Sequence, residues 1–437
     1  MKVSWRQVGD GIEFRLQPEA GDPRSRDGFR MLRSRFTVEV PVEIDRVHPD
    51  LLALAASLAA RPFTGEHLRF PTGISGLLAE RLGRHAGPVD PSLEPRPIPP
   101  GGVPALAFSG GVDSTAALAV LPASTHAVHL LRSVPGALRL ADLARRTVRP
   151  GRPRAHPETA LAAVEALAGA GRAVHVAASD LEFLRYPVGF PVDVANAIPA
   201  VLLADRENFD SVAFGTVFES AYRVGKLAYA DYAATDHSRF YGGVFAAAGV
   251  PLHQVVAGVS EVGTTRIAAA SPFGAVAQSC HRGPPGEPCM RCAKCFRKTL
   301  VDLAAAGEQP GDALLDRFFA SPQVRAEITK PWVKHEGVYA YATARYRGTH
   351  PVMQALRRRV RGDLLPTGWM ERWYPPSAAL LPDHRRAEAV AALAAAIAPM
   401  TPEDRAAAEA WDLAAVLDTD DYRARREALT EALAGNR

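Results

Sequence analysis

Cysteine is scarce in this sequence: the 437 residues contain only four, and all of them lie between positions 280 and 295. A disulfide framework spreads its cysteines along the fold, so this clustering argues against one. We expect instead a metal site in a reducing compartment.

Long apolar runs are lacking too. No run reaches the roughly 18 residues that a membrane span requires; Ala389–Pro399 is shorter and has Glu388 and Glu403 close on either side. The N-terminal segment, Met-Lys-Val-Ser-Trp-Arg-Gln, lacks the apolar core of a signal peptide. These absences predict a cytoplasmic protein with no membrane partner.

A strong charge of one sign is also absent, because 51 Lys and Arg face 47 Asp and Glu, a formal net charge of +4. This small charge neither demands nor excludes a nucleic-acid partner. Hydrophobic residues make up 47% of a chain long enough for two or three domains. A soluble globular protein is expected.

The chain outside its centre divides into three segments, and the first of them carries no motif that we assign to chemistry. Residues 1–85 predict a small α+β unit, since Ile12–Leu16 and Phe36–Val40 alternate apolar and polar residues as half-buried strands do. Residues 86–102 are rich in proline and predict a linker. Residues 306–437 predict a mostly helical region.

Residues 103–305 alternate predicted strands with predicted helices, which favours an α/β fold with a doubly wound, mostly parallel sheet. The predicted strands are Ala105–Phe108, Ala127–Leu131, Ala173–Ala177 and Ser211–Gly215, and the predicted helices are Thr115–Leu121, Pro157–Gly169 and Asp193–Asp205.

The most informative stretch is Ser109-Gly-Gly-Val-Asp-Ser114, here named the glycine loop (residues 109–114), between the first of these strands and its helix. Backbone N–H groups and the helix dipole at such a turn bind anions, and Gly110 and Gly111 allow the backbone to approach phosphates closely. Asp113 would repel a bare phosphate, which indicates a bridging Mg²⁺. The lysine of a Walker phosphate loop is missing.

Other side chains follow the ends of parallel strands and should share one rim with the glycine loop. Leu131 ends the second strand, and Glu219 follows the fourth. Arg223 and Lys226 either bind a carboxylate or phosphate there or lie on a polar helix face.

The cysteines form a C-x8-C-x2-C-x2-C pattern at Cys280, Cys289, Cys292 and Cys295. Two-residue gaps within a turn bring thiolates together, and four thiolates close the tetrahedral shell of a structural zinc ion. An iron–sulfur cluster and a redox dithiol remain alternatives.

The glycine loop resembles the Ser-Gly-Gly-x-Asp-Ser loop of the PP-loop (N-type) ATP pyrophosphatases. Followed about 165 residues later by the four cysteines, it resembles the 7-cyano-7-deazaguanine synthase branch of that superfamily over residues 103–300. Weaker matches are His156-Pro-Glu158, Phe190–Ala204 and Pro251–Ile267.

This resemblance implies that ATP is split to AMP and pyrophosphate while a substrate carboxylate is adenylated for capture by ammonia or an amine, giving an amide or nitrile. It implies Mg²⁺ at the loop, with Ser109, Asp113 and Ser114 catalytic and Glu219, Arg223 and Lys226 toward the substrate. The expected nucleotide contacts are Ser109, Gly110, Gly111, Val112, Asp113, Ser114, Thr115 and Leu131.

The chain departs from this branch after Gly215, where Thr-Val-Phe-Glu-Ser-Ala-Tyr-Arg replaces the branch's substrate segment. A protein or nucleic-acid substrate held by the terminal regions is therefore an alternative, with the basic run Arg357–Arg361 and with Arg372–Tyr374 as candidate contacts. Sulfur transfer is an alternative reaction if the cysteines hold an iron–sulfur cluster. A homodimer is left open as the oligomeric state.

Overall fold

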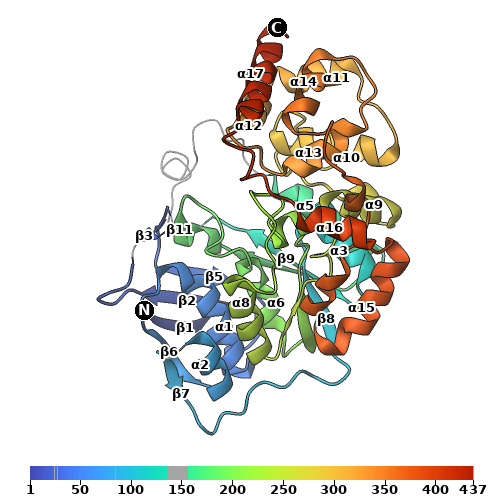
Figure 1. Cartoon of the computed structure of the whole chain (residues 1–437). Coiled ribbons are helices and arrows are strands. Elements are labelled where there is room, and N and C mark those ends of the chain that lie inside the picture. The colour runs from blue at the N-terminus through green and yellow to red at the C-terminus, as the bar shows by residue number, and fades with distance from the viewer. Residues whose placement is uncertain (24, 27, 84, 135–155, 437) are drawn as a thin grey trace.

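A single ten-stranded sheet runs through most of the protein, in the order β13-β12-β8-β9-β10-β5-β2-β1-β6-β7. The structure is a computed structural model that describes residues 1–436 except 24, 27, 84 and 135–155 (Figure 1). Six of the nine strand pairings are parallel and three are antiparallel. The α/β class and the mostly parallel sheet predicted from the sequence are confirmed.

One half of the sheet, from the edge strand β13 to β10, is entirely parallel and doubly wound. Its strands are β8 (Val103–Ala107), β9 (His126–Arg132), β10 (Val174–Ser179), β12 (Phe209–Ala213) and β13 (Leu252–His253). The first of them, β8, lies in the middle: β9 and β10 follow on one side, and β12 and β13 on the other. From β8 the strand order runs one way across the sheet through β9 and β10, and then the other way through β12 and β13. Open α/β sheets bind their ligands at such a switch point, which here lies between β8 and β12.

Helices cover both faces of this half. One face packs against α1 (Pro49–Ala60), α6 (Ile198–Leu203) and α8 (Asp236–Ala247). The other packs against α3 (Val112–Val120), α5 (Pro157–Gly169), α9 (Glu261–Ala270) and α15 (Asp383–Ala396). The alternation of the buried side chains explains this: Ala105 and Ala107 belong to the first core, and Leu106 to the second.

The N-terminal strands extend the same sheet. They are β1 (Lys2–Val8), β2 (Gly11–Gln17), β5 (Arg35–Val38), β6 (Leu68–Ile74) and β7 (Ala86–Val89), with α2 (Gly76–Leu82) between the last two. The strand β5 pairs antiparallel with β10, where Ser179 lies opposite Val38. Asp180 fixes the junction by pairing with Arg33 at 2.6 Å and accepting the Thr37 N–H at 2.8 Å. Both the sheet and its core thus continue across the boundary predicted near residue 85.

The segment predicted as a linker is held against the sheet. The strand β7 lies within it, and the buried Arg96 pairs with Asp205 at 2.6 Å while donating to the carbonyl of Gly249 at 2.7 Å. A minor sheet is formed by β3 (Ser25–Arg26), β4 (Phe29–Met31) and β11 (Arg185–Tyr186).

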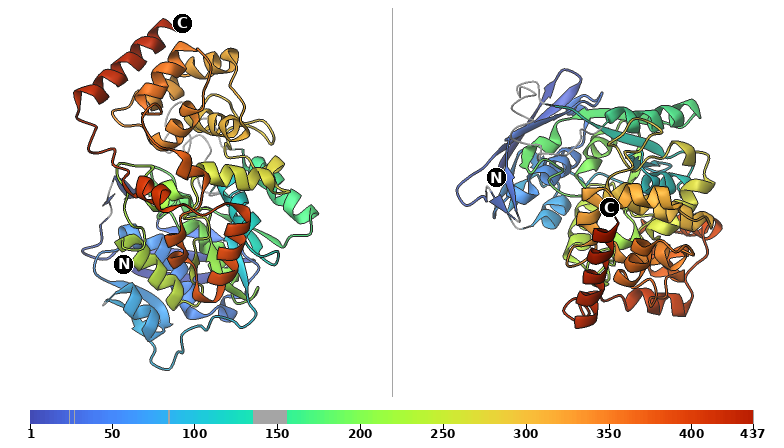
Figure 2. Two further views of the ribbon diagram at one scale, coloured as in Figure 1. Left: turned by 45° about the vertical axis from the view of Figure 1, so that its right-hand side comes forward. Right: turned by 90° about the horizontal axis from the view of Figure 1, so that it is seen from above.

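In the described part of the chain after residue 306, the regular elements are helices, as predicted. They are α11 (Asp312–Phe319), α12 (Pro322–Ile328), α13 (Glu336–Ala344), α14 (Pro351–Arg359), α15, α16 (Pro402–Glu409) and α17 (Asp420–Gly435). Helices α11–α14 and α17 gather at one end of the molecule with α10 (Ala293–Ala306), as two views show (Figures 1 and 2). Three of the four cysteines belong to the core of this helical end.

Within the described residues, none of the helices has both the length and the apolar character needed to cross a lipid bilayer.

Candidate functional site

The glycine loop leaves the carboxyl end of β8 and begins α3. Gly110 has a φ of +75°, in the left-handed region, and a Cβ there would lie 3.1 Å from the Cα of Ala160 on α5. Gly111 is the N-cap of α3 and supplies no side-chain cap. A turn of this kind directs backbone N–H groups outward at a helix N-terminus, which is the arrangement that binds phosphates.

The two serines of the loop have different surroundings. Ser114 is buried, and its hydroxyl donates to the carbonyl of Gly111 at 2.9 Å, so it holds the turn closed. Ser109 is exposed, and its hydroxyl lies 3.1 Å from that of Ser114. Ser109 is therefore the hydroxyl that is accessible to a ligand.

Neighbouring segments fix the loop in place. Gly215, just after β12, packs so closely that a Cβ would lie 2.7 Å from the backbone nitrogen of Ser114. Ser279 accepts the Val112 N–H at 3.3 Å, and the N–H of Gln278 donates to the carbonyl of Gly110 at 3.0 Å. The glycine loop is thus held between the end of β12 and the segment that enters the cysteines.

Asp113 is met by two side chains from distant parts of the chain. Thr264 on α9 donates to its Oδ1 at 2.8 Å, and Lys298 on α10 lies 3.1 Å from the same oxygen. The Asp113 side chain keeps 29% of its surface exposed, and its second oxygen, Oδ2, is used by neither contact. The sequence analysis missed both Thr264 and Lys298 as partners.

Behind Asp113 lies a buried group of charges on α9 and α10. Lys298 and Arg297 each pair with Glu261 at 2.9 Å, and all three side chains are at most 14% exposed. Burial by itself would raise the pKa of Glu261, but Lys298 and Arg297 outweigh it and hold the pKa well below its usual range. Glu261 is therefore ionised, and it orients the lysine that meets Asp113.

Glu219, on the short helix α7 (Phe218–Ala221), belongs to this group rather than to the surface. Its side chain is buried, and both carboxylate oxygens accept the N–H of Glu261, at 2.9 and 3.0 Å. Burial, and then the charge of Glu261, raise the pKa of Glu219 to about 8. At neutral pH the carboxyl is mostly protonated.

The other residues predicted to face the substrate lie elsewhere. Arg223 and Lys226 are exposed, and Arg223 has a φ of +64°. Neither they nor Glu219 are among the described residues that line the pocket beside the loop. Leu131 lies at the carboxyl end of β9, on the same edge of the sheet as the loop, and Thr115 is buried in the first turn of α3. Their roles stay predictions.

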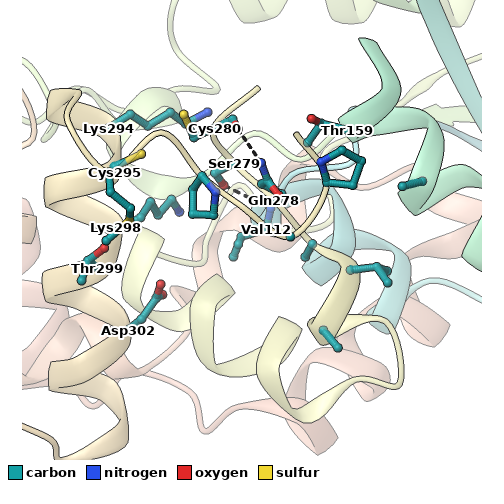
Figure 3. Close-up of a pocket in the computed structure, with 18 residues that line it drawn as sticks. Val112, Thr159, Gln278, Ser279, Cys280, Lys294, Cys295, Lys298, Thr299 and Asp302 are labelled. Carbon is teal, nitrogen blue, oxygen red and sulfur yellow. Dashed lines mark hydrogen bonds between the residues drawn. The ribbon is translucent and has the colours of Figure 1, made fainter. Parts of the chain in front are cut away.

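A pocket of about 320 Å³ lies between the start of α3, the segment Ala275–Cys280 and α10 (Figure 3). Val112 and Ser279 line one part of it. Along α10, at helical spacing, Lys294, Lys298 and Asp302 line another. Cys280 and Cys295 also line the pocket, so the cysteine site forms part of its wall.

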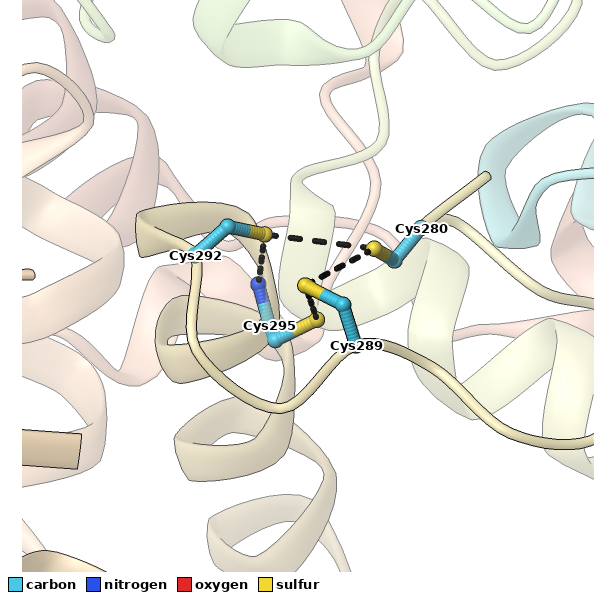
Figure 4. Close-up of side chains that lie close together, drawn as sticks. All are labelled: Cys280, Cys289, Cys292 and Cys295. Carbon is cyan, nitrogen blue, oxygen red and sulfur yellow. Dashed lines mark hydrogen bonds between the residues drawn. The ribbon is translucent and has the colours of Figure 1, made fainter. Parts of the chain in front are cut away.

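The four cysteine sulfurs converge (Figure 4). Cys280 lies 3.6 Å from Cys289 and 3.9 Å from Cys292, and Cys289 lies 3.7 Å from Cys295. Ligands 2.3 Å from a tetrahedral zinc ion are about 3.8 Å apart. Four cysteines on an iron–sulfur cluster are divided between at least two irons, so all four sulfurs cannot lie as close together as the ligands of one ion. The sulfurs therefore fit a single tetrahedral ion.

The cysteine loop (residues 280–295) also supports its surroundings. Cys292 is the N-cap of α10, where its sulfur accepts the Cys295 N–H at 3.4 Å. Thr159 on α5 donates to the carbonyl of Gly283 at 2.7 Å. Since Gln278 and Ser279 bond directly to the glycine loop, an ion held by the cysteines would stabilise that turn.

The basic run does not form an exposed surface. Of Arg357–Arg361, Arg358 alone is exposed, while Arg359 is fully buried and donates to a backbone carbonyl at 2.9 Å. Arg361 pairs with Glu336 at 2.8 Å. The aromatic side chains within Arg372–Tyr374 are buried. Most of these side chains are therefore packed within the protein, while Arg358 and Arg372 keep exposed surface, and a nucleic-acid contact at these positions stays a prediction.

Comparison with protein families matches residues 240–412 to a family of unknown function, DUF6395. The matched range contains Glu261, Thr264, the four cysteines and Lys298, but not the glycine loop. No curated protein and no solved structure matches the chain.

Proposed function

We propose that this protein is a ligase of the PP-loop ATP pyrophosphatase type, which adenylates a substrate carboxylate for amide or nitrile formation. One observation carries the proposal: the glycine loop opens α3 at the point where the order of the parallel strands switches, and Thr264 and Lys298 hold Asp113 there, beside a pocket that Lys298, Cys280 and Cys295 line.

The chain's own groups suit a nucleotide polyphosphate. The N-terminus of α3, where Gly111 supplies no side-chain cap, and the exposed Ser109 hydroxyl would bind pyrophosphate, and the helix dipole favours its charge. Lys298 and Lys294 supply positive charge on the facing wall of the pocket. Fixed dipoles and charges of this kind stabilise the charge that develops as pyrophosphate leaves.

Asp113 fits Mg²⁺ as a single carboxylate ligand. Magnesium in nucleotide sites binds one or two carboxylates together with substrate phosphates and keeps several waters. Thr264 and Lys298 hold Oδ1 of Asp113, so Oδ2 is oriented for a cation. When bound, Mg²⁺ would neutralise phosphate charge.

The reaction balances without a protein nucleophile. A carboxylate oxygen attacks the α-phosphorus of ATP, the bond from that phosphorus to the bridging oxygen breaks, and pyrophosphate leaves. An amine nitrogen then attacks the acyl carbon of the adenylate, and AMP leaves with the carboxylate oxygen. For a nitrile, the oxygen of the primary amide formed with ammonia attacks the α-phosphorus of a second ATP and pyrophosphate leaves. The nitrogen gives up its two protons as AMP leaves with the former amide oxygen, and the carbon–nitrogen triple bond forms.

Sulfur transfer is the less favoured alternative, because it calls for an available thiol or an iron–sulfur cluster. The four sulfurs lie within 4.8 Å of one another and suit one ion, for which we propose Zn²⁺. Cysteines that bind a metal ion as thiolates must stay reduced, as they do in a reducing compartment. We therefore propose that the protein is cytoplasmic.

The test is the nucleotide product. The purified protein, incubated with Mg-ATP, an amine donor and a panel of small carboxylates, is expected to release AMP and pyrophosphate in equal amounts and only with its substrate. Asp113→Ala is expected to abolish this release while leaving the circular dichroism spectrum unchanged. ADP and phosphate as the main products would refute the proposal.

Charge-reversal variants at three positions test where the substrate binds. Charge reversal at Lys294 should raise the KM of the carboxylate more than that of ATP if the substrate enters the pocket beside α10. Charge reversal at Arg223 or Lys226 should do so if the predicted Gly215–Arg223 segment holds it. No selective effect in any of the three would favour a macromolecular substrate bound elsewhere.

A further inference from the structure

A second cluster of metal-ligating side chains lies at the edge of the sheet opposite the glycine loop. His126 is the first residue of β9, and His175 is the second residue of β10. These strands are parallel and His175 lies opposite Val128, so both histidines point to the same face of the sheet. Glu207 joins them from the turn between α6 and β12.

The three side chains converge to within the reach of one ion. His126 Nδ1 lies 3.0 Å from His175 Nε2, and Glu207 Oε2 lies 3.9 Å and 3.8 Å from these two nitrogens. Ligands at 2.0–2.1 Å from a tetrahedral ion are separated by roughly 3.3 Å. The cluster therefore needs shifts of only a few tenths of an ångström to share an ion.

Neighbouring side chains hold the ligands in this arrangement. The ring of Phe209 on β12 stands edge-on to both imidazoles, with centroids 5.3 and 6.2 Å away. Arg206 pairs with the other oxygen of Glu207, Oε1, at 3.1 Å and leaves Oε2 toward the histidines. Support of this kind orients metal ligands.

We propose that His126, His175 and Glu207 form a second metal site, separate from the cysteines, which takes a zinc-class divalent ion. Two imidazoles and one carboxylate are ligands that Zn²⁺ accepts, and three protein ligands leave a fourth position for water. The side chains are about one-fifth exposed, so an ion can enter from solvent. A bound ion would join β9 and β10 to the turn before β12.

The test uses the full-length chain with its cysteine site already loaded with zinc. Equilibrium dialysis against Zn²⁺, followed by metal analysis, is expected to give two ions per chain for the unaltered protein. His175→Gln and Glu207→Gln should each retain one ion and weaken the second site at least about 100-fold, more than the loss of a supporting contact costs. Glu207→Gln, which changes a turn residue rather than a strand residue, tests the site independently if His175→Gln does not fold.

His237→Gln is the matched control, because His237 also contacts a carboxylate, with its Nε2 2.9 Å from Asp193 Oδ1. It should retain two ions. Co²⁺ distinguishes the sites further, since the second ion should add visible bands without the near-ultraviolet charge-transfer band of thiolate ligands. One ion per chain in the unaltered protein, or two in both ligand variants, would overturn the proposal. Neither readout uses ATP or turnover, so the result is independent of the proposed ligase activity.

Discussion

Lys298 lines the pocket and connects Asp113 with the buried charges behind it. It pairs with Asp113 on one side and with Glu261 on the other, and its side chain is 7% exposed. Burial alone would lower the pKa of Lys298, but the two carboxylates outweigh this and raise it. The lysine is thus a fixed positive charge beside the oxygen of Asp113.

Lys298→Met keeps most of the side-chain volume and removes the charge. Because Glu261 and Asp113 each lose a buried partner, we expect the free energy of unfolding to fall by about 3–5 kcal/mol and AMP formation to be lost. Lys294→Met, on the same helix and in the same pocket but exposed, should leave stability within about 0.5 kcal/mol of the original. Urea unfolding measures both, and equal stabilities for the two variants would contradict the role of Lys298.

Glu219 gives the protein a dependence on pH. Its pKa of about 8 in the folded state lies above the ordinary value of 4.5, so the unfolded chain binds fewer protons between pH 4.5 and pH 8. Stability from this group is therefore present in full below pH 4.5 and is lost progressively as the pH rises to 8.

Glu219→Gln keeps an oxygen that accepts the Glu261 N–H and cannot ionise. We expect it to flatten the loss of stability between pH 4.5 and 8 and to be more stable than the original by on the order of 3–5 kcal/mol at pH 8.5. Glu431→Gln, an exposed position on α17, is the control and should leave the pH profile unchanged. Denaturant unfolding across this pH range checks the result; parallel profiles for Glu219→Gln and the original would contradict it.

At the scale of elements, the cysteine loop and the glycine loop act as one unit. Gln278 and Ser279 bond to the glycine loop immediately before the chain reaches Cys280, and the cysteine loop also contacts the first turn of α5. An ion bound by the cysteines would therefore limit the movement of the glycine loop.

Cys289→Ser should release the metal and lower the free energy of unfolding by several kcal/mol, because metal-binding energy is also folding energy. Loss of the two backbone contacts to the glycine loop should also raise the Kd for ATP about 10- to 30-fold. Ser279→Ala removes one of these contacts with the metal retained, and should raise the Kd about 5-fold at most. Metal analysis and ATP titration measure both effects. A brown protein containing iron and acid-labile sulfide would contradict the zinc proposal.

At the scale of the whole molecule, the first 100 residues and the α/β centre share one sheet and one core. Phe14 and Phe36 stack with ring centroids 5.0 Å apart on β2 and β5, and α1 is buried along nearly its whole length in the same core as α6. Removing this part exposes the edge of β10 and one face of the parallel strands.

A chain beginning at residue 103 is therefore expected to lose cooperative unfolding and to aggregate, because it leaves apolar surface and an unpaired strand edge in water. Removing residues 420–437 is the contrasting truncation. It uncovers α14 and the Glu336 carboxylate that accepts from Tyr422 at 2.6 Å, and should lower stability while the sheet persists. Near-ultraviolet circular dichroism and urea unfolding distinguish the outcomes; a cooperative transition in the chain beginning at residue 103 would contradict the shared core.

The sequence by itself determined the features that depend on neighbouring residues. A glycine pair between an apolar strand and a helix predicts the turn at residues 109–114, since local backbone freedom and the helix start are properties of that segment. Cysteine spacing predicts the convergence of the sulfurs for the same reason. Alternating strands and helices predicted the doubly wound centre, because parallel strands require crossover helices.

Only the tertiary structure decided which distant groups meet. Lys298 and Thr264 reach Asp113 across 185 and 151 residues, and Glu219 turns inward to Glu261 instead of toward the pocket. Periodicity shows that a helix face or strand face is buried, but not which partner it is buried against. In the same way, β5 pairs with β10 through backbone groups that every residue carries. The continuity of the sheet therefore had no signature in the side chains.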